Sequence, residues 1–337
     1  MDVDLSQFPT AQLALLPTPV VELKALEKSC GHPQLYMEQD SLSGPIYGGN
    51  KIRKLEFLLG DALAKRHKSV ITYGAAGSNH ALATAVCCRK LGLKAISILA
   101  PQANSEHVRK NILMGYAVGA ELHLYPHFNE FPKATEKLAE ACERRDGIAP
   151  YIIPAGGTNA LGALGYVKAA FEMARQIQPD VIYVPMGTGG THAGLLTGLR
   201  LAGLKTRVEA IRVTHPQFKR KSDILQLCGE ICTLLGTEPV VPESDIIIRD
   251  EFFGENYGIP TPEGKDAVAR FRSEENVYLE NTYTGKTVAA LLHDLREGRL
   301  VGQTVLYWNT LNSRDFSDSI KDVDYHDLPK EFHSYFE

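Results

Sequence analysis

The sequence lacks long hydrophobic runs and a marked excess of charge of either sign. Its 337 residues include 36 Lys or Arg and 40 Asp or Glu, a net charge of −4, so no basic field exists to gather the phosphates of a nucleic acid. Glycine, proline or charge closes each apolar segment within about ten positions, short of the roughly 18 residues that cross a bilayer. We therefore expect a cytoplasmic protein that binds neither nucleic acid nor membrane.

Cysteine is also scarce, with six residues and no C-x-x-C pair. The adjacency of Cys87 and Cys88 suits buried helix positions better than a disulfide framework. Cys228 and Cys232 share a helix face, but no further ligand lies near them in the sequence. We expect reduced thiols and no metal site. With 44% hydrophobic and 23% charged residues, the chain is typical of a globular protein of about two domains.

What is present is a regular alternation of helical and strand patterns, interrupted by a Gly- and Pro-rich stretch at 150–165. Such alternation predicts an α/β fold with right-handed crossovers and largely parallel sheets. The interruption is the best candidate for a hinge. The expected helices are 52–63, 81–91, 106–118, 133–145, 161–176, 191–202 and 223–235, and the expected strands are 69–75, 95–100, 121–125, 180–185 and 207–214.

The strongest local signal is a glycine-rich loop between the strand 180–185 and the helix 191–202. It consists of Gly187, Thr188, Gly189, Gly190 and Thr191. Glycines let a phosphate approach the backbone closely, and the N-terminus of the following helix adds favourable partial charge. A tight turn without a ligand is the alternative. The sequence is not a Walker loop, and His192 stands where a dinucleotide-binding loop has its third glycine.

A second signal is a lysine that follows two glycines at the start of the helix 52–63. Asn50 is a natural cap for this helix, and Lys51 follows it. The helix dipole, with burial and the neighbouring Arg53 and Lys54, is expected to favour the neutral amine that attacks carbonyl groups. Lys51 is therefore a Schiff-base candidate, and a solvated basic first turn is the alternative.

A third cluster, Gly77-Ser78-Asn79-His80, follows the strand 69–75. Open α/β sheets bind ligands at such strand ends, and Ser78 and Asn79 can donate hydrogen bonds to an anion. The alternative is a helix cap followed by a turn.

Together these motifs resemble the aminocyclopropane-carboxylate deaminase and D-cysteine desulfhydrase family of pyridoxal-phosphate enzymes, within the tryptophan-synthase-β superfamily. The resemblance implies two domains, each an open, mainly parallel twisted sheet covered by helices. Residues 1–52 and 160–337 would form the larger domain and 53–159 the smaller, with the active site in the cleft between them. The matching segments are 40–44, 48–56, 78–80, 156–157, 187–191, 257–260 and 283–286.

The resemblance also implies roles for individual residues. Lys51 would hold pyridoxal 5'-phosphate covalently, and Asn79 would face its phenolic oxygen. The loop 187–191, helped by Lys54, would hold the phosphate, while Ser78 would lie beside the substrate carboxylate. Tyr257 and Tyr283 would stand over the substrate as acid or base groups or as aids to the departure of the leaving group. A homodimer and a small amino-acid substrate are implied as well.

Two threonines bear on the reaction type. Ring-opening deaminases of the family carry a glutamate after the second tyrosine, where this chain has Thr284. The desulfhydrase-like members use a threonine near the C-terminus to contact the pyridine nitrogen, and Thr310 matches it. A neutral hydroxyl leaves the ring a weaker electron sink, which suits β-elimination of a good leaving group.

Two departures from the family pattern indicate a changed pocket. Gly77 replaces a usual glutamine, which removes a donor to the substrate carboxylate. Leu311 and Asn312 replace glycines that let the backbone approach the cofactor.

The sequence therefore predicts a lyase that eliminates thiolate and ammonia from a small amino acid, with D-cysteine giving pyruvate, sulfide and ammonia. The alternatives are 1-aminocyclopropane-1-carboxylate deaminase, a pyridoxal-phosphate-binding protein with little turnover, and a nucleotide-binding oxidoreductase. The last requires the glycine that His192 replaces.

Overall fold

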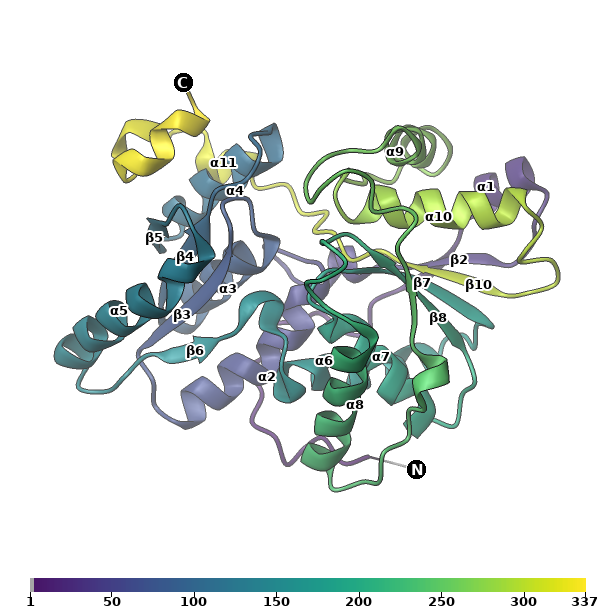
Figure 1. Cartoon of the computed structure of the whole chain (residues 1–337), viewed down its shortest axis with the longest axis horizontal. Coiled ribbons are helices and arrows are strands. Elements are labelled where there is room, and N and C mark those ends of the chain that lie inside the picture. Colours follow the sequence, from purple (N-terminus) through teal and green to yellow (C-terminus); the bar gives the residue numbers. More distant parts are fainter. Residues whose placement is uncertain (1–2) are drawn as a thin grey trace.

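The computed structural model describes residues 3–337 and contains two sheets, each with helices packed on it (Figure 1). The larger sheet has the order β1-β2-β10-β7-β8-β9, and all neighbours are parallel except β1 and β2. Its central strands β10, β7 and β8 are almost entirely buried, as a parallel sheet covered on both faces requires, whereas the edge strands β1 and β9 are partly exposed. The strands are β1 (Val20–Glu22), β2 (Leu35–Glu38), β7 (Val181–Met186), β8 (Arg207–Arg212), β9 (Ile247–Arg249) and β10 (Val305–Trp308).

The smaller sheet has the order β5-β4-β3-β6 and is parallel throughout. Its strands are β3 (Ser69–Ala75), β4 (Lys94–Ala100), β5 (Glu121–Leu124) and β6 (Tyr151–Ile153). The predicted α/β fold with two mainly parallel sheets is confirmed. Strand β6 lies inside the Gly- and Pro-rich stretch 150–165, where the sequence predicts only a hinge.

The helices cover both sheets and meet between them (Figure 1). Helix α2 packs on α6 and also on α3, so it contacts both halves of the molecule. The short α11 packs against α4, and the C-terminal turn 330–335 joins the core beside the smaller sheet. The helices are α1 (Lys24–Cys30), α2 (Asn50–Ala64), α3 (Asn79–Leu91), α4 (Glu106–Ala117), α5 (Phe131–Asp146), α6 (Ala160–Ala174), α7 (Gly190–Leu201), α8 (Lys221–Leu235), α9 (Pro262–Glu274), α10 (Thr284–Arg296) and α11 (Ser317–Ile320).

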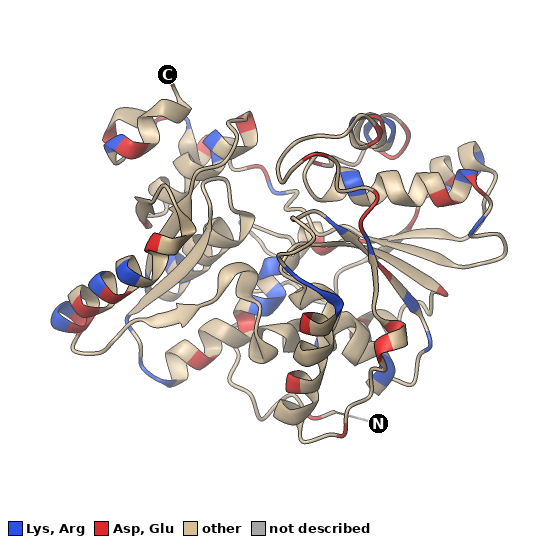
Figure 2. Ribbon diagram, in the orientation of Figure 1, with Lys and Arg blue, Asp and Glu red and all other residues tan. Residues whose placement is uncertain are grey.

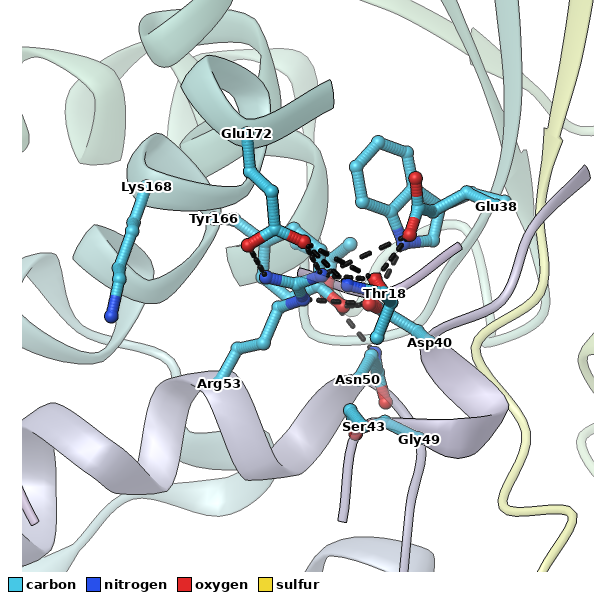
Figure 3. A network of polar contacts seen from close by, with 12 residues as sticks. Thr18, Glu38, Asp40, Ser43, Gly49, Asn50, Arg53, Tyr166, Lys168 and Glu172 are labelled. Carbon is cyan, nitrogen blue, oxygen red and sulfur yellow. Dashed lines mark hydrogen bonds and ion pairs between the residues drawn. The ribbon is translucent and has the colours of Figure 1, made fainter. Parts of the chain in front are cut away.

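A buried ionic network fixes α2 against the larger sheet (Figure 3). The Arg53 Nε donates to Asp40 at 2.6 Å, and its two terminal nitrogens donate to Glu172 on α6 at 2.8 and 3.1 Å. Asp40 also accepts from the Tyr166 hydroxyl and, at 2.7 Å, from Trp308 Nε1 on β10. A buried guanidinium is tolerated because its charge is paired and its donors are satisfied.

Charged residues of both signs are spread over helices, loops and strand ends, and basic residues gather at the start of α2 between the two sheets (Figure 2). None of the helices described over residues 3–337 combines the length and apolar character needed to traverse a membrane.

Candidate active site

One cavity of about 1230 Å³ lies between the two sheets. It opens where the carboxyl ends of β3, β4, β7, β8 and β10 meet, which is where open α/β sheets bind ligands. The structure brings together every site residue predicted from the sequence. Lys51, Lys54, Ser78, Asn79, Gly187, Thr188, Gly189, Gly190, Thr191, Tyr257, Tyr283 and Thr310 all line this cavity.

Lys51 is the second residue of α2. Gly49 precedes the helix, and its φ of +89° is a backbone conformation that glycine adopts readily. The predicted cap is wrong: Asn50 is helical, and its side chain makes no capping hydrogen bond. Instead, Asn50 Nδ2 donates to the Thr191 hydroxyl at 3.0 Å, and Asn50 Oδ1 accepts from Lys51 Nζ at 3.0 Å. Asn50 therefore links the lysine to the glycine loop.

Burial lowers the pKa of the Lys51 amine to about 8. Arg53 does not contribute as expected, because its guanidinium is directed into the ionic network (Figure 3). Lys54 does face the cavity, and its Nζ donates to the Gly156 carbonyl at 3.2 Å. Burial, and then the charge of Lys51, holds the pKa of Lys54 well below its usual value. Two amines thus share one buried space with a reduced tendency to be protonated.

The glycine loop joins β7 to α7 and forms a cradle of donors. Gly189 has a φ of +87°. A Cβ at Gly190 would lie 2.8 Å from Lys54 Nζ and 2.8 Å from Thr158 Oγ1, so only glycine leaves this space open. The hydroxyls of Thr158 and Thr188 are 2.6 Å apart. Backbone N–H groups, hydroxyls and an amine converge here on the N-terminus of α7, which suits a phosphate. Sequence reasoning missed Thr158, which carries no motif.

Ser78 ends the loop after β3 and caps α3. Its hydroxyl oxygen accepts from the Ala81 N–H at 3.2 Å, so the capping alternative is also true. Ser78 packs closely against Gly74, which has no side chain to obstruct it. A Cβ at Gly74 would lie 2.5 Å from Ser78 Oγ. Capping uses the oxygen as an acceptor and leaves the hydroxyl hydrogen available to a ligand.

The Asn79 amide is oriented by two neighbours that the sequence did not single out. Its Oδ1 accepts from the Tyr47 hydroxyl at 3.2 Å and from Asn111 Nδ2 at 3.0 Å. Asn111 is itself fixed, because its Nδ2 donates to the Gly77 carbonyl at 2.9 Å. With its oxygen occupied, Asn79 is left with its N–H donors for a group in the cavity.

Tyr257 and Tyr283 lie next to each other in the lining of the cavity. Their hydroxyl oxygens are 2.9 Å apart, and their rings meet edge to face with centroids separated by 6.0 Å. Burial raises the pKa of Tyr257 and raises that of Tyr283 well above the usual value. Both phenols are therefore protonated at neutral pH, and as hydroxyl donors they suit the acid role better than the base role.

Thr310 is buried at the end of β10 and lines the cavity, and its carbonyl accepts from the Asn50 N–H at 3.1 Å. Thr284 is turned into the start of α10, where its hydroxyl donates to the Glu280 carbonyl at 3.1 Å. The Glu280 carboxylate accepts from the N–H groups of residues 282, 283 and 284, which directs it toward that helix terminus.

Leu311 and Asn312, the two residues that replace family glycines near the C-terminus, have different consequences. Leu311 is buried and lines the cavity, which places an apolar side chain there as expected. Asn312 points elsewhere, since its Oδ1 accepts from the Gly48 N–H at 2.6 Å. Asn312 therefore holds the turn that precedes Lys51.

His192 follows the loop and is fully buried, and neither ring nitrogen has a hydrogen-bond partner within residues 3–337. Burial lowers its pKa to about 4, so the ring is neutral at pH 7. It fills space beside the loop where a dinucleotide site would have glycine.

Comparison with known proteins decides the family. A profile described as pyridoxal-phosphate dependent enzyme matches residues 11–310. The chain belongs to this family. A putative 1-aminocyclopropane-1-carboxylate deaminase of Pyrococcus horikoshii is 38% identical over 311 residues, which cover 91% of this chain and 92% of the relative. A D-cysteine desulfhydrase of Yersinia enterocolitica is 34% identical over 301 residues, which cover 87% and 90%.

A crystal structure of an ACC deaminase homologue matches with a TM-score of 0.82 and 35% identity, over 92% of this chain and 94% of that one. The resemblance inferred from the motifs is thereby confirmed, and the oxidoreductase alternative is wrong. The protein is a pyridoxal-phosphate-dependent lyase, and pyridoxal phosphate is its cofactor.

The residues of the cavity fit this cofactor. At Lys51, an amine with a lowered pKa is available for the cofactor's aldehyde. The glycine loop leaves open, for the phosphate, a space that a Cβ at position 190 would fill. Asn79, whose oxygen is occupied, would have its amide N–H groups available for the phenolic oxygen. When bound, pyridoxal phosphate supplies the electron sink that stabilises charge at the substrate α-carbon.

Proposed function

We propose that the protein eliminates sulfide from D-cysteine and yields pyruvate and ammonia. One observation supports elimination over ring opening. Among residues 3–337, the only carboxylate lining the cavity is Glu280, and it is occupied by three backbone N–H groups. The Thr284 hydroxyl is bonded to the Glu280 backbone, so Thr310, which lines the cavity, supplies the neutral hydroxyl for the ring nitrogen. A weaker sink suffices where the leaving group is a thiolate.

In this reaction the chain's own residues bind the substrate and move protons. The Ser78 hydroxyl and the N-terminus of α3 bind the substrate carboxylate. The Lys51 amine takes the α-proton. The hydroxyl pair of Tyr257 and Tyr283 donates a proton to the departing sulfur. The released enamine takes up water, so that D-cysteine and water give pyruvate, hydrogen sulfide and ammonia.

The test is an absorbance scan of the purified holoenzyme while D-cysteine, L-cysteine, D-serine and 1-aminocyclopropane-1-carboxylate are added in turn. Keto acid and sulfide are assayed in parallel. We expect pyruvate and sulfide in equal amounts from D-cysteine. Formation of 2-oxobutyrate from the cyclopropane substrate would instead identify a deaminase. Spectral changes without any keto acid would contradict both activities.

Three further features are part of this proposal. Residues 1–52 and 160–337 form the larger domain and 53–159 the smaller, with the tail of the larger domain reaching across the smaller sheet. The protein forms a homodimer and works in the cytoplasm. Sedimentation velocity of the holoenzyme tests the dimer, cell fractionation tests the compartment, and limited proteolysis within 150–165 tests the domain boundary.

A further inference from the structure

Gln102 is a cavity residue that neither the motifs nor the proposed chemistry uses. It lies in the connection between β4 and α4, and its Oε1 accepts from the Gly77 N–H at 3.1 Å. Position 77 itself cannot carry a side chain, because a Cβ there would lie 2.7 Å from Val108 Cγ2 and 3.1 Å from Val108 Cα on α4. Gln102 thus brings a side-chain amide to the edge of the Ser78 loop from another segment of the chain.

The hydrogen bond to Gly77 fixes which end of the amide faces the cavity. A backbone N–H can only donate, so the accepting atom is the oxygen, and the amide nitrogen points the other way. Gln102 Nε2 lies 3.7 Å from the Cβ position of Gly258, beside Tyr257. It makes no hydrogen bond to any residue from 3 to 337. Two N–H donors are therefore free between the Ser78 loop and the Tyr257 loop.

The backbone of Gln102 is also held in place. Its N–H donates to the Tyr335 hydroxyl at 3.0 Å, and Asn104 Nδ2 donates to the Tyr335 carbonyl at 2.9 Å. Tyr335 is buried in the core of the smaller sheet. The C-terminal turn thereby positions Gln102, so little conformational freedom remains to be lost when a ligand binds.

The lining of the cavity has little negative charge that would repel an anion. The one carboxylate of its described lining, Glu280, accepts from backbone N–H groups at the start of α10. Ser78 offers a hydroxyl hydrogen next to Gly77, at the N-terminus of α3. A carboxylate held by Ser78 would find a further neutral donor in Gln102.

We propose that Gln102 Nε2 donates a hydrogen bond to the α-carboxylate of the amino-acid substrate, and that Tyr335 positions it for this. The proposal rests on the proposed function, because it assumes an amino acid bound beside Ser78. It makes Gln102 a residue that selects amino acids over amines lacking the carboxylate.

The test compares ligand affinities of the holoenzymes and needs no turnover. Wild type, Gln102→Leu, Gln102→Glu and the surface control Gln226→Glu on α8 are titrated with alanine, in the enantiomer that wild type binds, and with ethylamine. The readout is the ligand concentration that gives half of the cofactor's absorbance change. Alanine carries the carboxylate, ethylamine lacks it, and neither has a leaving group.

We expect Gln102→Leu to raise the half-saturating alanine concentration about 10-fold or more, as loss of a hydrogen bond to a charged group predicts. Gln102→Glu keeps the acceptor for Gly77 and the side-chain size, and like-charge repulsion should weaken alanine binding further. Ethylamine binding should stay within about twofold in every variant. Tyr335→Phe should show the same selective loss at smaller size, while Gln226→Glu should behave as wild type.

Equal losses for alanine and ethylamine, or no loss for either, would overturn the proposal. Failure of the proposed function has a different signature: wild type would bind alanine but release no keto acid from D-cysteine. Turnover of D-cysteine with unchanged alanine affinity in both Gln102 variants would refute only the role of Gln102.

Discussion

At the scale of single residues, burial rather than neighbouring charge lowers the pKa of the Lys51 amine. The pKa of its amine falls to about 8 because the charged form is desolvated in the cavity. Arg53, two positions along, is neutralised by Asp40 and Glu172 and does not face it. The sequence singled out Lys51, but the lowered pKa of its amine follows from burial, which only the packing shows.

We predict that the rate at which pyridoxal phosphate loads onto apoprotein rises with pH, is half-maximal near pH 8 and levels off above that, because only the neutral amine attacks the aldehyde. Stopped-flow absorbance measures the rate. Lys51→Ala should form no covalent adduct that borohydride can trap, whereas Lys65→Ala at the exposed end of α2 should load normally. An adduct in Lys51→Ala would assign the chemistry to another amine.

The tyrosine pair gives a second prediction at this scale. Tyr257→Phe or Tyr283→Phe removes one hydroxyl of a pair whose pKa values are raised, and so removes a proton donor. The loss of kcat should be on the order of 10²-fold, in the range of general acid catalysis. The cofactor's absorbance should persist, since neither hydroxyl is part of the phosphate cradle. A variant with unchanged kcat would exclude that tyrosine as the proton donor.

At the scale of elements, the start of α2 is fixed by glycines and by a strand end far away in sequence. A Cβ at Gly49 would lie 2.7 Å from the Thr310 carbonyl and 3.1 Å from the Asn312 N–H nitrogen. The Asn50 N–H donates to that same carbonyl. The orientation of Lys51 thus depends on close contact between residues about 260 positions apart.

We predict that Gly49→Ala lowers stability and also impairs cofactor loading. Its control is Gly203→Ala, which has a similar φ of +76° but meets open space among the described residues. The control should lose about 1 kcal/mol from backbone strain, and Gly49→Ala about 2–4 kcal/mol because of the added clash and because its ψ of 174° belongs to a region that essentially only glycine adopts. Thermal unfolding and cofactor stoichiometry measure the two effects. Equal losses would show that the contact with Thr310 can relax.

At the scale of the whole molecule, the network around Arg53 joins segments that come together only in the folded chain (Figure 3). It includes Glu38 at the end of β2, whose carboxyl accepts from the Thr18 hydroxyl and whose Oε2 is buried without a partner in the described chain. Burial, and then the charge of Asp40, raises the pKa of Glu38 to about 8. A neutral carboxyl thus lies beside the charged groups.

This network predicts a pH dependence of stability. An unfolded glutamate titrates near 4.5, whereas folded Glu38 keeps its proton to about pH 8. The stabilising contribution is therefore complete below pH 4.5 and is lost as the pH rises to 8, by about 1.4 kcal/mol per pH unit. Glu38→Gln should remove this loss, so that its stability relative to wild type rises between pH 5 and pH 8.

Urea unfolding at several pH values measures the effect, and the surface variant Glu136→Gln on α5 is the control. A relative stability of Glu38→Gln that does not change between pH 5 and pH 8 would show that Glu38 is ionised in the folded protein.

The sequence by itself determined the alternation of elements and the three short motifs to which we assign the chemistry, the glycine loop among them. Local periodicity and chain direction decide these features, and the predicted helices and parallel strands match the observed ones closely. Only the tertiary structure decided which partners orient those motifs. Asn50, which the sequence predicts as a helix cap, instead donates to Thr191. Asn111 fixes Asn79, and Gln102 reaches the Ser78 loop. These contacts join residues from separate elements, and their distances depend on how the two sheets pack, which no local pattern encodes.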